Sequence, residues 1–288
     1  MSRRRFSPAP APPLEDEDLL QEIPMRLPPQ PSSLPRASAV CKRWRSILSD
    51  PQFVQRFRKH HGKPPLIGFF NQSYTVVCDF NPILEAPDRV HANRLSVPKR
   101  QSSMGKWRFM GCRNGLAVLV NGGRREAVVW DPLTGQQHRV PFPPGLHDSL
   151  AVIEKLADKN AISGWSFQLL RMEDGGLGLA ALSGLTVQLW ERKLNCDGVV
   201  GWVLLQKTIP LEGLLPSTKP LVFIVGYDED TNAIVLSTGI GNFMIQLDSM
   251  QIKHIIKIND MCIDMFYPYH NFYTAGRGVG WKWVELEL

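Results

Sequence analysis

The feature that most constrains the fold of this chain is a proline-rich corner between two short helical patterns near the N-terminus. Leu19, Leu20, Ile23 and Leu27 recur at helical spacing, and the Pro28-Pro29 pair then ends that pattern. Acidic residues at 15–18 precede it, where they favour the positive end of a helix dipole. The sequence therefore predicts a short first helix that stops at a sharp turn.

Two further helices are expected after the corner. The second begins at Pro35, a position that the first turn of a helix tolerates. Its apolar face comprises Ala37, Val40, Cys41, Trp44, Ile47 and Leu48. Asp50 caps the third helix, Pro51 opens it and Gly62 follows it. Its apolar face comprises Phe53, Val54 and Phe57.

So small a helical segment is marginal as a domain of its own. Two readings of its apolar side chains follow from the periodicity: they pack onto the rest of the chain, or they meet another protein. The spacing alone does not decide between them. Residues 1–13, rich in Pro, Ala and Arg, are expected to be a disordered tail. The expected domains are then 14–61, which is helical, and 62–288.

Four motifs in the helical segment carry a family resemblance. They are Leu-Leu-x-Glu-Ile at 19–23, Arg-Leu-Pro at 26–28, Val-Cys-Lys-x-Trp-Arg at 40–45 and Asp-Pro-x-Phe at 50–53. Together they resemble the F-box, closely in the form found in grasses. The resemblance implies docking on the Skp-type adaptor of a cullin–RING ubiquitin ligase. The residues it assigns to that interface are Leu14, Leu19, Leu20, Ile23, Leu27, Pro28, Val40, Cys41 and Trp44.

Two positions depart from the family pattern. Glu15-Asp16 replaces the Leu-Pro pair that often opens the motif, and Pro24 stands where a bulky apolar residue is preferred. A proline inside a helix removes one backbone hydrogen bond. We therefore expect weaker adaptor binding than in the family, and stronger binding in a Pro24→Leu variant.

After Gly62 the pattern changes to repeated pairs of apolar runs joined by glycine turns, which is a hairpin signature. The three copies lie at 114–131, 176–191 and 232–248, with turns at 122–123, 183–184 and 239–241. A third strand is expected after each copy, at 136–140, 202–208 and 253–258. A last strand is expected at 281–286, after a glycine-rich crossing.

Such recurring meanders are typical of a β-propeller. The Val-Val-Trp-Asp-Pro-x-Thr-Gly run at 128–135 also resembles the associated β-domain of plant F-box proteins. Seven blades need roughly 280–315 residues, more than follow the helices, so an incomplete propeller with an exposed strand edge is expected. The expected fold class is α+β multidomain: a three-helix F-box followed by an all-β, propeller-like domain.

The remaining chemistry argues against a cofactor or a metal. Five scattered cysteines predict reduced, buried thiols and a cytoplasmic or nuclear protein. Gly176 and Gly178 formally match a dinucleotide fingerprint, but a strand is expected where that motif needs a helix. Asp228, Glu229 and Asp230 are read as a solvated turn rather than a calcium site. Basic helix faces without interleaved aromatic residues give no case for nucleic acid, and no apolar run reaches membrane-spanning length.

The favoured function is that of a non-catalytic substrate adaptor of an SCF-type ubiquitin ligase. One alternative is an interaction or structural protein whose degenerate F-box no longer engages the ligase. Another is an enzyme in the propeller, which a cluster of buried ionisable residues at a central channel would favour. The adaptor reading requires that the apolar helix faces are not enclosed by this chain's own strands.

Overall fold

A computed structural model of the chain describes residues 17–72, 79–97, 107–121, 124, 126–141, 167–172, 174–194, 198, 200–212, 221–256 and 264–273. The chain divides into two compact units. One, the helical unit, comprises residues 1–65, 85–90 and 271–288, and the other, the β unit, comprises residues 66–84 and 91–270.

The helical unit has four helices in its described part, where the sequence predicted three. They are α1 (Glu17–Met25), α2 (Ser33–Ser38), α3 (Lys42–Ser49) and α4 (Pro51–His61). The predicted second helix is therefore wrong in its extent. Its chain breaks at Ala39, the C-cap of α2, and Cys41 is extended with φ −157° and ψ 167°. The Cys41 Sγ accepts a hydrogen bond from the Trp44 amide at 3.4 Å and so caps α3.

The start and end of α4 agree with the sequence. The Asp50 carboxylate accepts the Phe53 amide at 3.1 Å, Pro51 follows it, and Gly62 ends the helix with φ 69°. An N-cap of this kind is worth about 1 kcal/mol. The core of this unit is one cluster of buried side chains made of Leu34, Ala37, Leu48, Phe53, Phe57 and Phe272. The helices therefore have an interior of their own, to which residues from the end of the described chain contribute.

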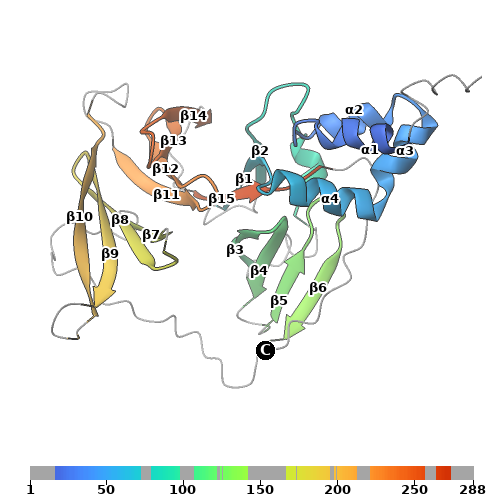
Figure 1. The fold of residues 1–288 in the computed structure, drawn as a ribbon. Helices are drawn as coiled ribbons and strands as arrows, with labels where there is room; N and C mark the ends of the chain where they lie inside the picture. The colour runs from blue at the N-terminus through green and yellow to red at the C-terminus, as the bar shows by residue number, and fades with distance from the viewer. Residues whose placement is uncertain are drawn as a thin grey trace, which may run out of the picture. The chain divides into compact units, whose positions relative to one another are not determined.

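The described strands of the β unit form four antiparallel sheets (Figure 1). The first sheet has the order β15 (Met265–His270), β1 (Leu66–Gln72), β2 (Asp79–Pro82). The second runs β3 (Trp107–Arg113), β4 (Leu116–Asn121), β5 (Glu126–Trp130), β6 (Gln137–Pro141). The third has β7 (Phe167–Arg171), β8 (Leu177–Ser183), β9 (Thr186–Leu194), β10 (Val200–Pro210), and the fourth has β11 (Val222–Asp228), β12 (Ala233–Thr238), β13 (Gly241–Gln246), β14 (Ile252–Ile256). A 3₁₀ helix, η1, spans Ala92–Leu95.

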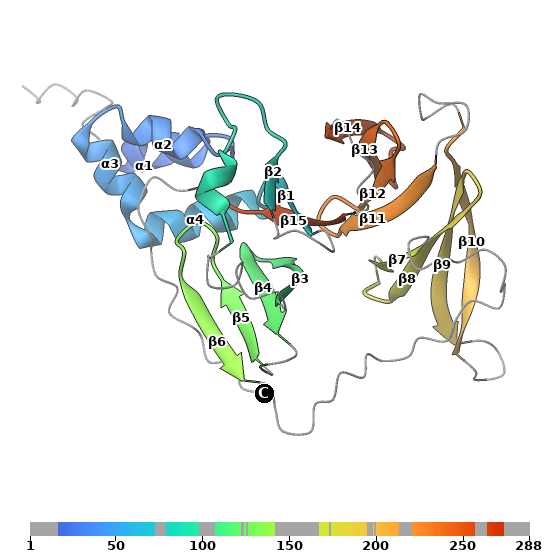
Figure 2. The same ribbon diagram turned by 180° about the vertical axis from the view of Figure 1, so that it is seen from behind.

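The three predicted hairpins are confirmed as β4–β5, β8–β9 and β12–β13, and each predicted third strand is present as β6, β10 or β14. The sequence missed the first strand of each of these sheets, β3, β7 and β11. It also missed the pairing of β1 with β15, which lie side by side in both views (Figures 1 and 2). The predicted strand at 281–286 and the turn at 122–123 lie outside the described residues.

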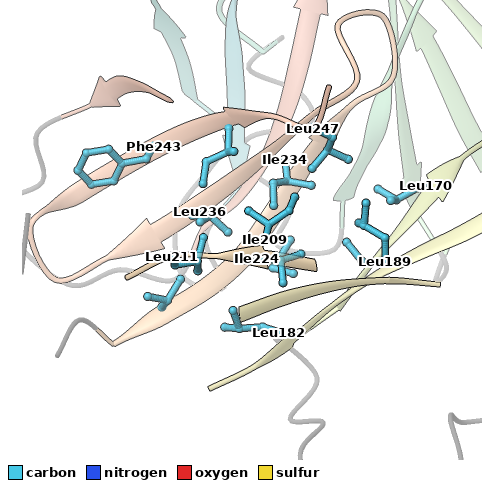
Figure 3. Packing of buried hydrophobic residues seen from close by; sticks show 14 residues of the cluster. Leu170, Leu182, Leu189, Ile209, Leu211, Ile224, Ile234, Leu236, Phe243 and Leu247 are labelled. Carbon is cyan, nitrogen blue, oxygen red and sulfur yellow. The ribbon is translucent and has the colours of Figure 1, made fainter. Parts of the chain in front are cut away.

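The faces of neighbouring sheets carry the core of the β unit. One cluster joins the third and fourth sheets through side chains such as Leu189, Ile209, Ile234 and Leu236 (Figure 3). A second cluster surrounds Phe70, whose ring packs against aromatic rings from its own sheet and from the second sheet: Phe80, Tyr269, Phe109 and Trp130. Burying a large apolar side chain is worth roughly 1.5–3 kcal/mol, so these faces hold the sheets together.

The sheets meet through one edge strand of each. Strand β11 contacts both β7 and β15, and β15 also contacts β3. We call β3, β7, β11 and β15 the inner strands. Sheets that meet through inner strands and bury their faces against their neighbours make a propeller-like arrangement, and the described strands form no closed barrel.

Candidate functional site

The helical unit leaves part of its predicted interface open. Leu19 and Ile23 on α1 are 43% and 41% exposed, and Val40, between α2 and α3, is 68% exposed. Pro28 and Cys41 are exposed as well. Apolar side chains on separate segments of one small unit are therefore accessible. We call Leu19, Ile23 and Val40 the exposed apolar set.

The other predicted interface residues lie deeper. Leu27 and Trp44 are half-buried and pack against the core cluster of the helices. Leu20 is only 2% exposed, so it supports α1 from within rather than offering a contact surface. Leu14 lies outside the described residues. Pro24 lies inside α1 and is buried. The bulky apolar side chain that the family prefers at this position would therefore lie in the interior of the helical unit.

Contacts from α4 position α1. The Arg56 guanidinium donates to Gln21 Oε1 at 2.5 Å, and the His61 ring contacts the Met25 carbonyl at 3.1 Å. On α1 itself, Arg26 pairs with Glu22 at 2.9 Å, an exposed pair worth a few tenths of a kcal/mol. The placement of α1 thus depends on α4, whose beginning is fixed by the Asp50 cap.

Basic residues lie on either side of Val40 in the sequence. Arg36, Lys42, Arg43 and Arg45 are all exposed on α2 and α3. Charges at the rim of an apolar patch raise the rate of encounter with a partner of opposite sign more than they raise affinity. The surface is thus suited to a protein partner with an apolar pocket and an acidic rim.

The β unit contains a cavity of about 390 Å³ that the sequence did not predict. All four inner strands contribute to its lining, together with the turns that follow β3 and β11. We call it the inner cavity. Its charged lining residues are Arg113, Arg171, Asp228, Glu229, Asp230 and His270. Of these, the sequence had singled out only the acidic turn.

A buried ionisable pair lies at this cavity. The His270 Nε2 is 2.8 Å from Asp228 Oδ1, and the two side chains are 8% and 1% exposed. Burial raises the pKa of the Asp228 carboxyl. The hydrogen bond and charge of His270 lower it, as do hydrogen bonds from the Thr231 hydroxyl and the Asp230 amide. These lowering effects outweigh burial, so the pKa lies below its ordinary value. The sequence predicted a solvated turn at the three acidic residues 228–230. For Asp228 that expectation is wrong, because its side chain is buried, whereas Glu229 and Asp230 are exposed.

Asp228, Asp230 and His270 form the group of potential metal ligands found among the described residues, with ligand atoms within 4.8 Å of one another. The two carboxylates, however, face different nitrogens of the ring: Asp228 faces Nε2, and Asp230 faces Nδ1 at 3.8 Å. One ion cannot bind both nitrogens of one imidazole. We read the group as a structural tie between β11 and β15.

Two other sequence predictions can be compared with the structure. Cys41 is exposed and Cys112 is half-exposed, and neither is in a disulfide, so the expectation of buried thiols is wrong for both. Gly178 lies within strand β8, and a second strand, β9, follows; the helix that a dinucleotide fingerprint needs is replaced by a hairpin. No helix in the described ranges is both long and apolar enough to cross a membrane.

Comparisons with known proteins agree with the architecture. Residues 17–60 match the F-box-like family model, so this part of the chain is an F-box-like domain, here followed by an all-β region. The chain is similar to an F-box protein of Arabidopsis thaliana (28% identity, 46% of this chain, 34% of the relative). It is also similar to two F-box/kelch-repeat proteins of that plant, each 30% identical (41% and 42% of this chain; 30% and 29% of the relative).

The chain thus spans about a third of the length of the curated relatives it matches. Among solved structures, the extracellular domain of a one-component system from B. thetaiotaomicron matches with 13% identity and a TM-score of 0.18. The matched region covers 62% of this chain and 22% of that one, and a likeness at this score is no evidence of a shared fold or function.

Proposed function

We propose that this chain is a substrate-recognition adaptor of an SCF-type cullin–RING ubiquitin ligase. In this proposal the F-box-like domain docks on a Skp-type adaptor, and the β unit binds a target protein. The chain is not a catalyst: it tethers the target, which raises its effective concentration near the ubiquitin-charged enzyme held by other subunits. The proposed location is the cytoplasm, the nucleus or both.

The observation that carries the proposal is the exposure of Leu19, Ile23 and Val40 within the F-box-like domain. These side chains stay open even though the helices have a buried core of their own. Large exposed apolar groups on a small unit favour a partner that covers them. The similarity of the chain to plant F-box proteins supports a Skp-type adaptor as that partner.

Co-purification with a Skp-type adaptor tests the proposal. The full chain is expressed with the adaptor as wild type, as Val40→Asp and as Ile240→Asp. Ile240, in the turn between β12 and β13, is a matched control because it is also apolar and is 44% exposed. Burying an unpaired carboxylate at an interface is costly, so Val40→Asp should reduce adaptor capture by about tenfold or more.

The control should capture as much adaptor as the wild type. Failure of the wild-type chain to capture the adaptor, or equal capture by Val40→Asp, would contradict the proposal. Circular dichroism of each variant establishes that the helices remain folded. Val40 is a sharper test than Trp44, because Trp44 packs against the core and its removal also weakens the fold.

A further inference from the structure

The inner cavity brings together the ends of four strands. The last residue of each inner strand is chargeable: Arg113 ends β3, Arg171 ends β7, Asp228 ends β11 and His270 ends β15. All four line the same cavity, although they are far apart in sequence. A cavity with convergent ionisable groups is a candidate binding site.

Most of these charges are already compensated. Arg171 pairs with Glu229 at 2.6 Å, and His270 faces Asp228 at 2.8 Å and Asp230 at 3.8 Å. Glu229 therefore faces a guanidinium, whereas Asp228 and Asp230 share the one imidazole of His270. Arg113 is different: it is exposed and makes no ion pair within the part of the chain that the structure describes. The cation available to a ligand is thus the Arg113 guanidinium.

We propose that the inner cavity binds an acidic side chain from a peptide segment of the target, with Arg113 as its counter-ion. This inference rests on the proposed adaptor function and names the chemistry that the β unit would recognise. A guanidinium presents paired donors that match a carboxylate, and such charge-assisted bonds are stronger than neutral ones. At about 390 Å³, the cavity lies at the small end of ligand sites and suits one or two side chains.

The lining also offers an apolar contact beside the guanidinium. Met110 is 47% exposed, lies on the same strand as Arg113 and lines the cavity, as does Tyr267 of β15. A flexible thioether adapts to different neighbours. The expected recognition element is therefore an acidic residue with an apolar residue beside it.

A peptide array tests the inference on the full chain in complex with the Skp-type adaptor. The probes are short peptides with a fixed central Glu, Asp, Lys, Arg or Ala between randomised flanks. Wild-type protein should bind the Glu and Asp pools about tenfold more than the Lys and Arg pools. Arg113→Glu should abolish that preference. Arg108→Glu is the matched control, since Arg108 is an exposed arginine on the same strand and does not line the cavity.

The inference is overturned if no peptide pool binds above background or if the basic pools are preferred. It is also overturned if Arg108→Glu and Arg113→Glu lose the acidic preference equally. Adaptor capture is measured on the same samples. If the adaptor is captured and the acidic preference is absent, the cavity inference fails while the proposed function stands. If the adaptor is not captured, the adaptor function fails, and peptide binding by the chain alone is judged by the same criteria.

Discussion

His270 and Asp228 form a buried, hydrogen-bonded pair of ionisable side chains that joins two sheets of the β unit. The imidazole Nε2 lies 2.8 Å from the carboxylate, with His270 at the end of β15 and Asp228 at the end of β11. Thr231 and the Asp230 amide hold the same carboxylate at 2.6 and 3.2 Å. Removing one partner of such a pair leaves the other buried without compensation, which typically costs about 3–5 kcal/mol.

Asp228→Asn should therefore lower the stability of the β unit, and the loss should depend on pH. The folded pKa of Asp228 is depressed, so its contribution is fully present above the ordinary carboxyl pKa. This stabilisation is lost as the pH falls through the pKa of Asp228 in the folded chain, because the carboxyl of the unfolded chain has the higher pKa and is protonated first. The difference between wild type and Asp228→Asn should be largest near neutral pH and should narrow below the ordinary value of 3.8.

Urea midpoints from tryptophan fluorescence at several pH values measure this difference. Asp248→Asn serves as the control, because Asp248 is exposed and accepts a surface bond from Asn232. That change should shift stability by no more than about 0.5 kcal/mol at any pH. If the stability difference between wild type and Asp228→Asn stayed constant as the pH was lowered, the carboxylate charge of Asp228 would not be the source of the stability.

Gly226 tests how closely β11 approaches β15. It lies at a register shift in β11, and a Cβ added there would press against the backbone carbonyl of Phe266. Backbone cannot move aside as a flexible side chain can, so Gly226→Ala should cost about 1–3 kcal/mol. Gly201→Ala in β10 is the matched control, since among the described residues, its chain neighbours aside, no atom lies within 4 Å of its added Cβ. Thermal midpoints that fell equally for both variants would contradict this close approach.

The parts of the fold that the sequence predicted are those with local causes. Helix α4 is an example: the Asp50 carboxylate accepts the Phe53 amide at 3.1 Å, and Gly62 ends the helix with φ 69°. Hairpins such as β8–β9 were also predictable, because apolar alternation and a Ser-Gly turn occur together within a few residues. In both cases the deciding contacts lie close in sequence.

The parts that were missed depend on distant contacts. Strand β1 pairs with β15 across almost the whole β unit, and no local turn announces that pairing. The inner cavity is missed for the same reason, because His270 and Asp228 are 42 residues apart. A partial signal existed: β3, β7 and β11 each end in a charged residue. The break between α2 and α3 was missed because Val40 and Cys41 fit the helical spacing although their side chains are exposed.

Pro24 gives the last prediction, on the strength of adaptor docking. Within α1 its ring removes one backbone donor, and its side chain is buried. Pro24→Leu restores that donor and adds apolar bulk, so we expect α1 to be firmer and adaptor capture to rise. Pro24→Ala separates the two effects, because alanine restores the backbone donor without adding bulk. Alanine is also a strong helix former.

Titration of each variant against the Skp-type adaptor measures the result. An increase in affinity for both variants assigns the defect to the helix backbone, whereas an increase for Pro24→Leu alone assigns it to the missing bulk. Binding equal to or weaker than the wild type in both would mean that α1 already presents Leu19 and Ile23 as well as it can. In that case the proline does not limit docking, and the prediction is wrong.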